Sequence, residues 1–165
     1  GYPDIPEITY GFGASVKWKG FDFSVFFQGV GNVNFFANNT YTQPFSATNI
    51  SMANVFTDLV GNYWTPENLN AKYPRLTTSV NENNKQVSSF WMVDGSYIRL
   101  KNAEIGYTLP KSWVNKMRIE GLRIYISGMN LLTFSDFKLW GPDLQTGAAN
   151  YPNNKVYNIG ISLTF

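Results

Sequence analysis

The 165-residue sequence contains no cysteine and no histidine. Without cysteine the chain has no disulfide framework and no thiolate metal site, and without histidine it lacks the commonest catalytic base and metal ligand. Its aspartates and glutamates are dispersed, and no pair of them is spaced for acid–base catalysis. We therefore expect a protein that is not an enzyme, with no catalytic, cofactor-binding or metal-binding residues.

Charge is also scarce, because only 15% of the residues are charged whereas 17% are aromatic. Ordinary soluble domains have about 25% charged residues. The net charge of +2 is too small, and its lysines and arginines too scattered, to indicate nucleic-acid binding. No apolar run approaches the roughly 20 residues that a membrane helix needs, so contact with lipid would have to be made by strands.

The last stretch, Asn154 to Phe165, alternates strictly between apolar and polar residues. Its apolar positions are Tyr157, Ile159, Ile161, Leu163 and Phe165. The two aromatic ends are separated by about 26 Å along a strand, or roughly 20 Å of membrane depth when the strand is tilted by about 40°. This pattern predicts a membrane-spanning strand, and the alternative is an edge strand of a soluble domain.

Four more strands are expected from similar patterns. Glu7 to Lys19 and Phe21 to Val30 alternate on either side of the tight connection Lys19-Gly20, which predicts a hairpin of long strands. A third strand is expected from about Phe90 to Leu109 and a fourth from Gly121 to about Leu132.

The third strand carries two cations that conflict with simple alternation. Arg99 and Lys101 would fall on the apolar face, where a cation costs about 2 to 4 kcal/mol at the bilayer midplane and about 0 to 1 kcal/mol near the interface. Two arrangements avoid that cost. Either both cations lie at or above the rim, or a bulge near Lys101 turns Ile98 and Leu100 outward instead.

The connections between these five strands alternate in length. Lys19-Gly20 and Pro110 to Arg118 are short, the latter with room for one helical turn, whereas Gly31 to Ser88 and Phe134 to Asn153 are long and irregular. If the last strand ends on the periplasmic side, both short connections lie there, which is the asymmetry of outer-membrane barrels. Such a barrel needs at least about eight strands, so we expect this chain to pair with more polypeptide.

Several motifs, spread in order over nearly the whole chain, resemble the C-terminal end of SusC/RagA-type TonB-dependent transporters. They occupy residues 6–12, 21–29, 64–68, 73–76, 94–102, 105–110, 122–128 and 130–133, and include Trp64-Thr65-Pro66-Glu67-Asn68 and Asp94-Gly95-Ser96-Tyr97-Ile98-Arg99-Leu100. In addition, Gly160, Leu163 and Phe165 resemble the C-terminal assembly signal of outer-membrane barrels. One departure is Trp140-Gly141-Pro142-Asp143, where the family more often has an Asp-Pro-Glu-like element.

The resemblance implies an all-β fold, an antiparallel transmembrane β-barrel segment of about five C-terminal strands from a 22-stranded barrel with long extracellular loops. Residues 1–165 would form the C-terminal part of a TonB-dependent receptor, without its plug and earlier strands. The turn-rich start, Gly1 to Pro6, carries no export signal, which agrees with a fragment. The implied location is the cell outer membrane.

The resemblance also implies the partners of the intact protein. They are the remainder of the SusC-like barrel, a SusD-like surface lipoprotein that acts as a lid, TonB, membrane lipid and a cargo, with no nucleic acid. The cargo stays open between oligosaccharide and peptide, because importers of both share these motifs.

Candidate cargo or lid contacts lie in the long connection after the second strand. They are Phe35, Phe36, Asn38, Asn39, Tyr41, Trp64 and Asn68. Aromatic rings stack on sugar rings, and amides bond hydroxyl or peptide groups. Residues 32–54 contain no charge at all, which favours a neutral polar cargo. The alternative is that these side chains fold the loop onto itself.

Two further hypotheses remain open. Arg99, Lys101, Glu104 and Arg123 are expected to be charge-paired residues of a polar barrel wall rather than a binding site. For the protein as a whole, the alternative function is a soluble all-β carbohydrate-binding module, whose aromatic residues would form a core and a sugar platform. A need for detergent would distinguish the transporter from the module.

Overall fold

The computed structural model describes residues 1–36, 55, 57, 59–77, 81–84, 86–137 and 153–165. The chain divides into two compact units, a sheet unit within residues 2–33 and 94–165 and a loop unit within residues 1 and 34–93. In the described ranges, no helix combines the length and the apolar character that a membrane crossing requires.

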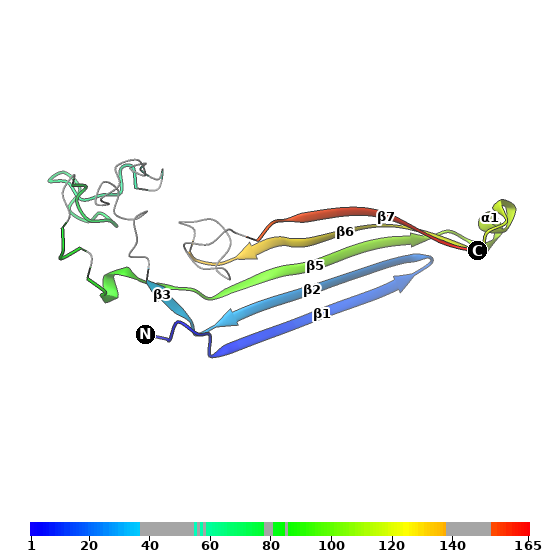
Figure 1. The fold of residues 1–165 in the computed structure, drawn as a ribbon, viewed down its shortest axis with the longest axis horizontal. Coiled ribbons are helices and arrows are strands. Elements are labelled where there is room, and N and C mark those ends of the chain that lie inside the picture. The colour runs from blue at the N-terminus through cyan, green and yellow to red at the C-terminus, as the bar shows by residue number, and fades with distance from the viewer. Residues whose placement is uncertain (37–54, 56, 58, 78–80, 85, 138–152) are drawn as a thin grey trace. The chain divides into compact units, whose positions relative to one another are not determined.

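The sheet unit is built from five long strands, each antiparallel to its neighbours (Figure 1). They are β1 (Ile8–Trp18), β2 (Phe21–Gly31), β5 (Tyr97–Thr108), β6 (Gly121–Phe134) and β7 (Val156–Thr164). Their order in the sheet is their order in the chain. The predicted all-β antiparallel fold is thereby confirmed, and the strand bounds differ by at most two residues at every end except the start of β5.

The hairpin between β1 and β2 is closed by Lys19 and Gly20 alone, since Trp18 pairs directly with Phe21. Both turn residues have positive φ, 48° at Lys19 and 89° at Gly20. A two-residue turn with two left-handed residues matches the right-handed twist of the strands. Glycine supplies the second position without strain, so the sequence Lys19-Gly20 sets the register of the whole hairpin.

The third expected strand, Phe90 to Leu109, begins seven residues later than predicted. Residues Ser89–Trp91 form a 3₁₀ turn and Met92–Asp94 form a short strand, β4, which pairs with β3 (Asn34–Phe36) in a separate two-stranded sheet. The physical reason for the break is local, because the Ser96 backbone N–H donates to Asp94 Oδ1 at 2.8 Å. The chain turns here between β4 and β5, and β5 starts only at Tyr97.

Lys101 occupies a bulge in β5, as the second of the two sequence-based arrangements predicts. On β2, Phe26 pairs with Asn102 and Phe27 with Leu100, so Lys101 has no partner in the ladder. Regular alternation, which would have put Arg99 and Lys101 on the apolar face, is therefore wrong. The bulge moves Ile98 and Leu100 to that face and Arg99 to the opposite one.

The connection from β5 to β6 contains one short helix, α1 (Lys111–Val114), followed by a 3₁₀ turn at Asn115–Met117. Val114 is buried, and Arg118 ends the turn in a left-handed conformation with φ of 56°. A helical turn was predicted here, and the structure has one that continues into a 3₁₀ turn.

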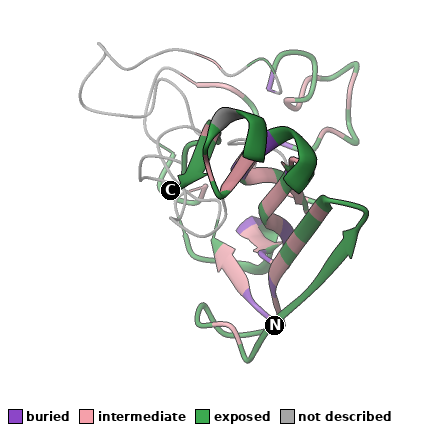
Figure 2. Ribbon diagram, turned by 90° about the vertical axis from the view of Figure 1, so that its right-hand side faces the viewer, coloured by how far each residue is buried: buried purple, intermediate pink, exposed green. Residues whose placement is uncertain are grey.

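The loop unit has a small core of its own, in which Leu59, Tyr73 and Trp91 are at most 5% exposed. Backbone bonds hold it together, with the Trp64 N–H donating to the Tyr73 carbonyl and the Tyr73 N–H to the Asn62 carbonyl, both at 3.0 Å. By contrast, the strands of the sheet unit are largely exposed, and β1 is exposed along its whole length (Figure 2). The sheet unit thus lacks a conventional core on its apolar side.

Candidate functional site

One face of the five-stranded sheet is apolar and uncovered. A row of paired residues crosses all five strands on this face: Val16, Phe23, Ile105, Ile126 and Ile159. Their side chains are 47–79% exposed. An apolar surface of this kind requires either lipid or a second protein layer.

The opposite face is polar along the adjacent row. There the register joins Ser15, Ser24, Glu104, Ser127 and Asn158. Neighbouring residues of a strand point to opposite faces, so the alternation of apolar and polar residues along each strand produces both rows. A sheet with one apolar and one polar face has the organisation of a membrane barrel wall, with lipid outside and water inside.

A charge cluster joins three strands on the polar face, near the end of the sheet that carries the short turns. The Arg123 guanidinium of β6 donates from Nη2 to Glu104 Oε1 of β5 at 2.6 Å and from Nε to Asp22 Oδ1 of β2 at 3.0 Å. Nη2 also bonds Asp22 Oδ2, which makes the contact with Asp22 bidentate. Gly106 makes this possible, since a Cβ there would overlap the guanidinium.

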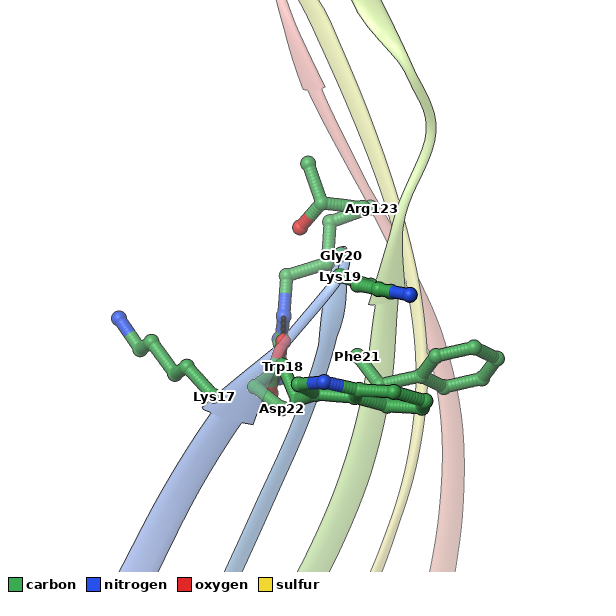
Figure 3. Close-up of a pocket in the computed structure, with 8 residues that line it drawn as sticks. Lys17, Trp18, Lys19, Gly20, Phe21, Asp22 and Arg123 are labelled. Carbon is green, nitrogen blue, oxygen red and sulfur yellow. Dashed lines mark hydrogen bonds and ion pairs between the residues drawn. The ribbon is translucent and has the colours of Figure 1, made fainter.

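The sequence predicted Arg99, Lys101, Glu104 and Arg123 as charge-paired wall residues; of these the structure pairs Arg123 with Glu104, and Asp22, the second carboxylate, was missed. Figure 3 shows Asp22 and Arg123 beside the β1–β2 turn, around a cavity of about 420 Å³ that Lys17 and Lys19 also line. The strand register could have revealed Asp22. It pairs with Gly106, and Thr108, the next residue of β5 on the same face, pairs with Arg123 on β6.

Arg99 and Lys101 do not join this cluster. Arg99 is 2% exposed, donates from Nε to Thr133 Oγ1 at 3.0 Å and lies 5.2 Å from the centre of the Tyr97 ring. Lys101 is half-buried at the bulge. Arg99 thus contacts a hydroxyl and an aromatic ring in the wall of the sheet.

Gly160, predicted as part of an assembly signal, has a packing role in β7. It pairs with Tyr125, and a Cβ at this position would overlap the Tyr125 ring. The ring in turn lies 4.9 Å from the Arg123 guanidinium. The other two signal residues, Leu163 and Phe165, are 50% and 84% exposed. Their role in assembly stays a prediction.

We expect Gly160→Ala to destabilise the folded protein by about 1 kcal/mol, because the Tyr125 ring must move and lose its contact with Arg123. Gly121→Ala is the matched control, since a Cβ at Gly121 meets only ordinary contacts of 3.6–3.7 Å. The control should be neutral or more stable by about 0.4–1 kcal/mol. Urea unfolding of the two variants in lipid vesicles measures the difference, and equal midpoints would contradict the packing role of Gly160.

The described candidate contacts of the loop unit are placed as follows. Asn68 donates from Nδ2 to the Gly61 carbonyl at 3.1 Å, and its backbone N–H donates to the Thr65 carbonyl at 3.0 Å. Asn68 therefore folds the loop onto itself. Phe35 and Phe36 lie in β3, half-buried and 47% exposed respectively. The other three candidates, Asn38, Asn39 and Tyr41, lie outside the described residues.

Trp64 lines a pocket of about 350 Å³ in the loop unit. Tyr73, Phe90 and Trp91 contribute further aromatic surface, and Arg75 adds a cation. The Trp91 indole N–H donates to the Asn84 carbonyl at 2.8 Å, which fixes the ring. A pocket of this size with aromatic walls suits one sugar ring or one amino-acid side chain. Within the described residues, no group of acidic side chains is arranged to hold a metal ion.

Comparisons with known proteins point to one class. The chain is 35% identical to TonB-dependent receptor P3 and 31% identical to TonB-dependent receptor P26, both of Formosa agariphila. The matches cover 97% and 98% of this chain but only 16% and 17% of the receptors. The chain thus spans about a sixth of the length of the curated relatives it matches. No protein-family model matches it.

Solved structures give the same answer. The chain is similar to the RagAB peptide importer in its open-open state, with a TM-score of 0.73 and 31% identity, and in its closed-closed state, with a TM-score of 0.75 and 30% identity. Each match covers 98% of this chain and 17% of the solved chain. The resemblance to TonB-dependent transporters of the RagA type, first seen in the motifs, is confirmed.

Proposed function

We propose, from the premise that its relatives are TonB-dependent receptors, that this chain forms five neighbouring strands of an outer-membrane importer barrel. The observation that carries the proposal is the uncovered apolar row from Val16 to Ile159, backed by a polar face. Lipid covers the first face and the aqueous lumen meets the second. The free edges of β1 and β7 pair with the remaining strands of the receptor.

The intact receptor, in this proposal, imports an oligosaccharide or a peptide with energy supplied through TonB. A SusD-like surface lipoprotein acts as its lid. The RagAB importer is described as a peptide importer, so its cargo is peptide. For this chain, the aromatic pocket at Trp64 and the uncharged segment 32–54 suit either neutral sugars or peptides. The role involves binding and conformational change and needs no catalytic residue.

The alternative, a soluble carbohydrate-binding module, fits the exposed surface less well. Monomeric soluble proteins rarely expose contiguous apolar patches of more than a few hundred Å². Here apolar side chains are exposed on all five strands, including Phe12 on β1 at 54% and Ile161 on β7 at 65%.

The test is uptake by cells that produce the full-length receptor. Fluorescent oligosaccharides and peptides of matched size are offered to these cells, to a strain without the receptor gene, and to a strain with inactive TonB. We expect one cargo class to accumulate only when receptor and TonB are both present, and a lipoprotein to co-purify with the receptor. Accumulation that does not depend on TonB, or a receptor absent from the outer membrane, would contradict the proposal.

A further inference from the structure

Among the described residues, the segments that connect or flank the strands differ in charge between the two ends of the five-stranded sheet. At the end with the short turns, the residues that connect the strands are Lys19-Gly20 and 109–120. They contain four cations and one acid, namely Lys19, Lys111, Lys116, Arg118 and Glu120. At the other end, the described residues of the sheet unit that flank the strands contain four acids and one cation, namely Asp4, Glu7, Asp94, Asp136 and Lys155.

The four cations of the turn end are all exposed. They are independent of the Arg123 cluster, whose guanidinium is already held by Asp22 and Glu104. The Lys19 ammonium lies 5.0 Å from the centre of the Trp18 ring, and Figure 3 shows it extending over that ring, while Lys17 extends to the other side of the turn.

Large aromatic side chains accompany these cations. Trp18 in β1 and Trp113 in α1 are 65% and 62% exposed, and Phe165 at the same end is 84% exposed. Indole rings prefer the boundary between hydrocarbon and head groups, and lysines near them extend into the head-group layer. The turn end therefore combines aromatic rings that suit the boundary between hydrocarbon and head groups with cations that suit the head-group layer.

We propose that this turn end binds the head groups of anionic phospholipids, in the membrane leaflet on the side of the short turns. This inference rests on the proposed function, which places the sheet in a membrane. It adds which class of lipid the sheet prefers. The occupant is a phospholipid and not a second protein, because the cations lie beside rings that suit the lipid boundary and directly past the lipid-facing residues. The acidic flanks at the other end would repel the same lipids, so the preference is one-sided.

The variant that tests this removes four charges without disturbing the turns. Lys19 and Arg118 both have left-handed backbones, and asparagine is among the residues that tolerate this conformation best. The neutral variant is therefore Lys19→Asn, Lys111→Gln, Lys116→Gln and Arg118→Asn. Its matched control keeps every charge, with Lys19→Arg, Lys111→Arg, Lys116→Arg and Arg118→Lys.

The experiment uses the full-length receptor in phosphatidylcholine vesicles with spin-labelled phosphatidylglycerol or spin-labelled phosphatidylcholine as the probe. Electron paramagnetic resonance gives the relative association constant of the two labelled lipids. We expect the wild type and the control variant to prefer phosphatidylglycerol by roughly tenfold, and the preference to disappear in the neutral variant. It should also fade at about 1 M salt, where the screening length falls to about 3 Å.

An inserted receptor with no preference for phosphatidylglycerol would overturn this inference alone, and so would a neutral variant that keeps the preference. Insertion is measured in the same vesicles by protection of the barrel from protease. A receptor that fails to insert would overturn the proposed function as well as the lipid site, so the two failures are distinguishable.

Discussion

Replacing Ile161 by arginine is expected to prevent assembly of the receptor in the outer membrane. Ile161 lies midway along β7 on the apolar face, pairs with Ile124 and is 65% exposed. A lipid-facing arginine near the bilayer midplane costs about 2 to 4 kcal/mol. That is a substantial part of the about 5 to 15 kcal/mol by which a folded domain is usually stable. The amount of heat-modifiable receptor in isolated outer membranes measures the effect.

The control must place the same arginine on the polar face of the same strand. Ser162 is the nearest such position, but it pairs directly with Arg123, so an arginine there would face a second guanidinium. Asn158 is better, because its partner is Ser127, whose own neighbour on β5 is Glu104. We expect Asn158→Arg to assemble normally. Equal assembly of Ile161→Arg and Asn158→Arg would show that the two faces are wrongly assigned.

Deleting the uncharged part of the first long connection is expected to abolish uptake while leaving the barrel inserted. From the sequence alone, the segment to remove is Asn32 to Asn54. The structure corrects its start, because β3 pairs with β4 and the Val33 carbonyl accepts a bond from the Gly95 N–H at 2.8 Å. The sharper deletion is therefore 37–54, which spares these contacts and contains the candidate residues Asn38, Asn39 and Tyr41.

The effect of this deletion is measured in one strain in two ways: by growth on the cognate nutrient and by the amount of receptor at the cell surface. In a second variant, a Gly/Ser segment of equal length replaces residues 37–54. This variant distinguishes the effect of losing these side chains from the effect of a shorter loop. We expect both variants to reach the surface and neither to support growth. Normal growth of either variant would place cargo recognition elsewhere, in the plug or in the lipoprotein.

Local patterns predict much of this structure. Alternation of apolar and polar residues locates β1, β2 and β7, and Lys19-Gly20 predicts the turn between β1 and β2. The charge of Lys101 on the apolar face indicates the bulge as one of two possible arrangements. Each of these signals lies within a few residues of the feature it predicts. They are reliable because a slip of one residue would turn every apolar side chain of a strand to the wrong face.

Features that depend on distant partners were not predictable in the same way. The pairing of β3 with β4, the core around Leu59 and the bond from Arg123 to Asp22 all join residues far apart in the chain. The glycines offered an indirect signal, since glycine inside a strand often marks a close approach of another group. Gly106 beneath Arg123 and Gly160 beneath Tyr125 are two such cases.

The lengths of the connections also bear on the order in which the sheet is assembled. About 12 residues separate β5 from β6, whereas about 65 separate β2 from β5. Closing the longer loop costs roughly 1.5 kcal/mol more in chain entropy, since that cost grows with the logarithm of loop length. The two hairpins, β1–β2 and β5–β6, can therefore form early from neighbouring residues, within microseconds for an isolated hairpin. From loop length alone, pairing of β2 with β5 is expected to follow the formation of these two hairpins.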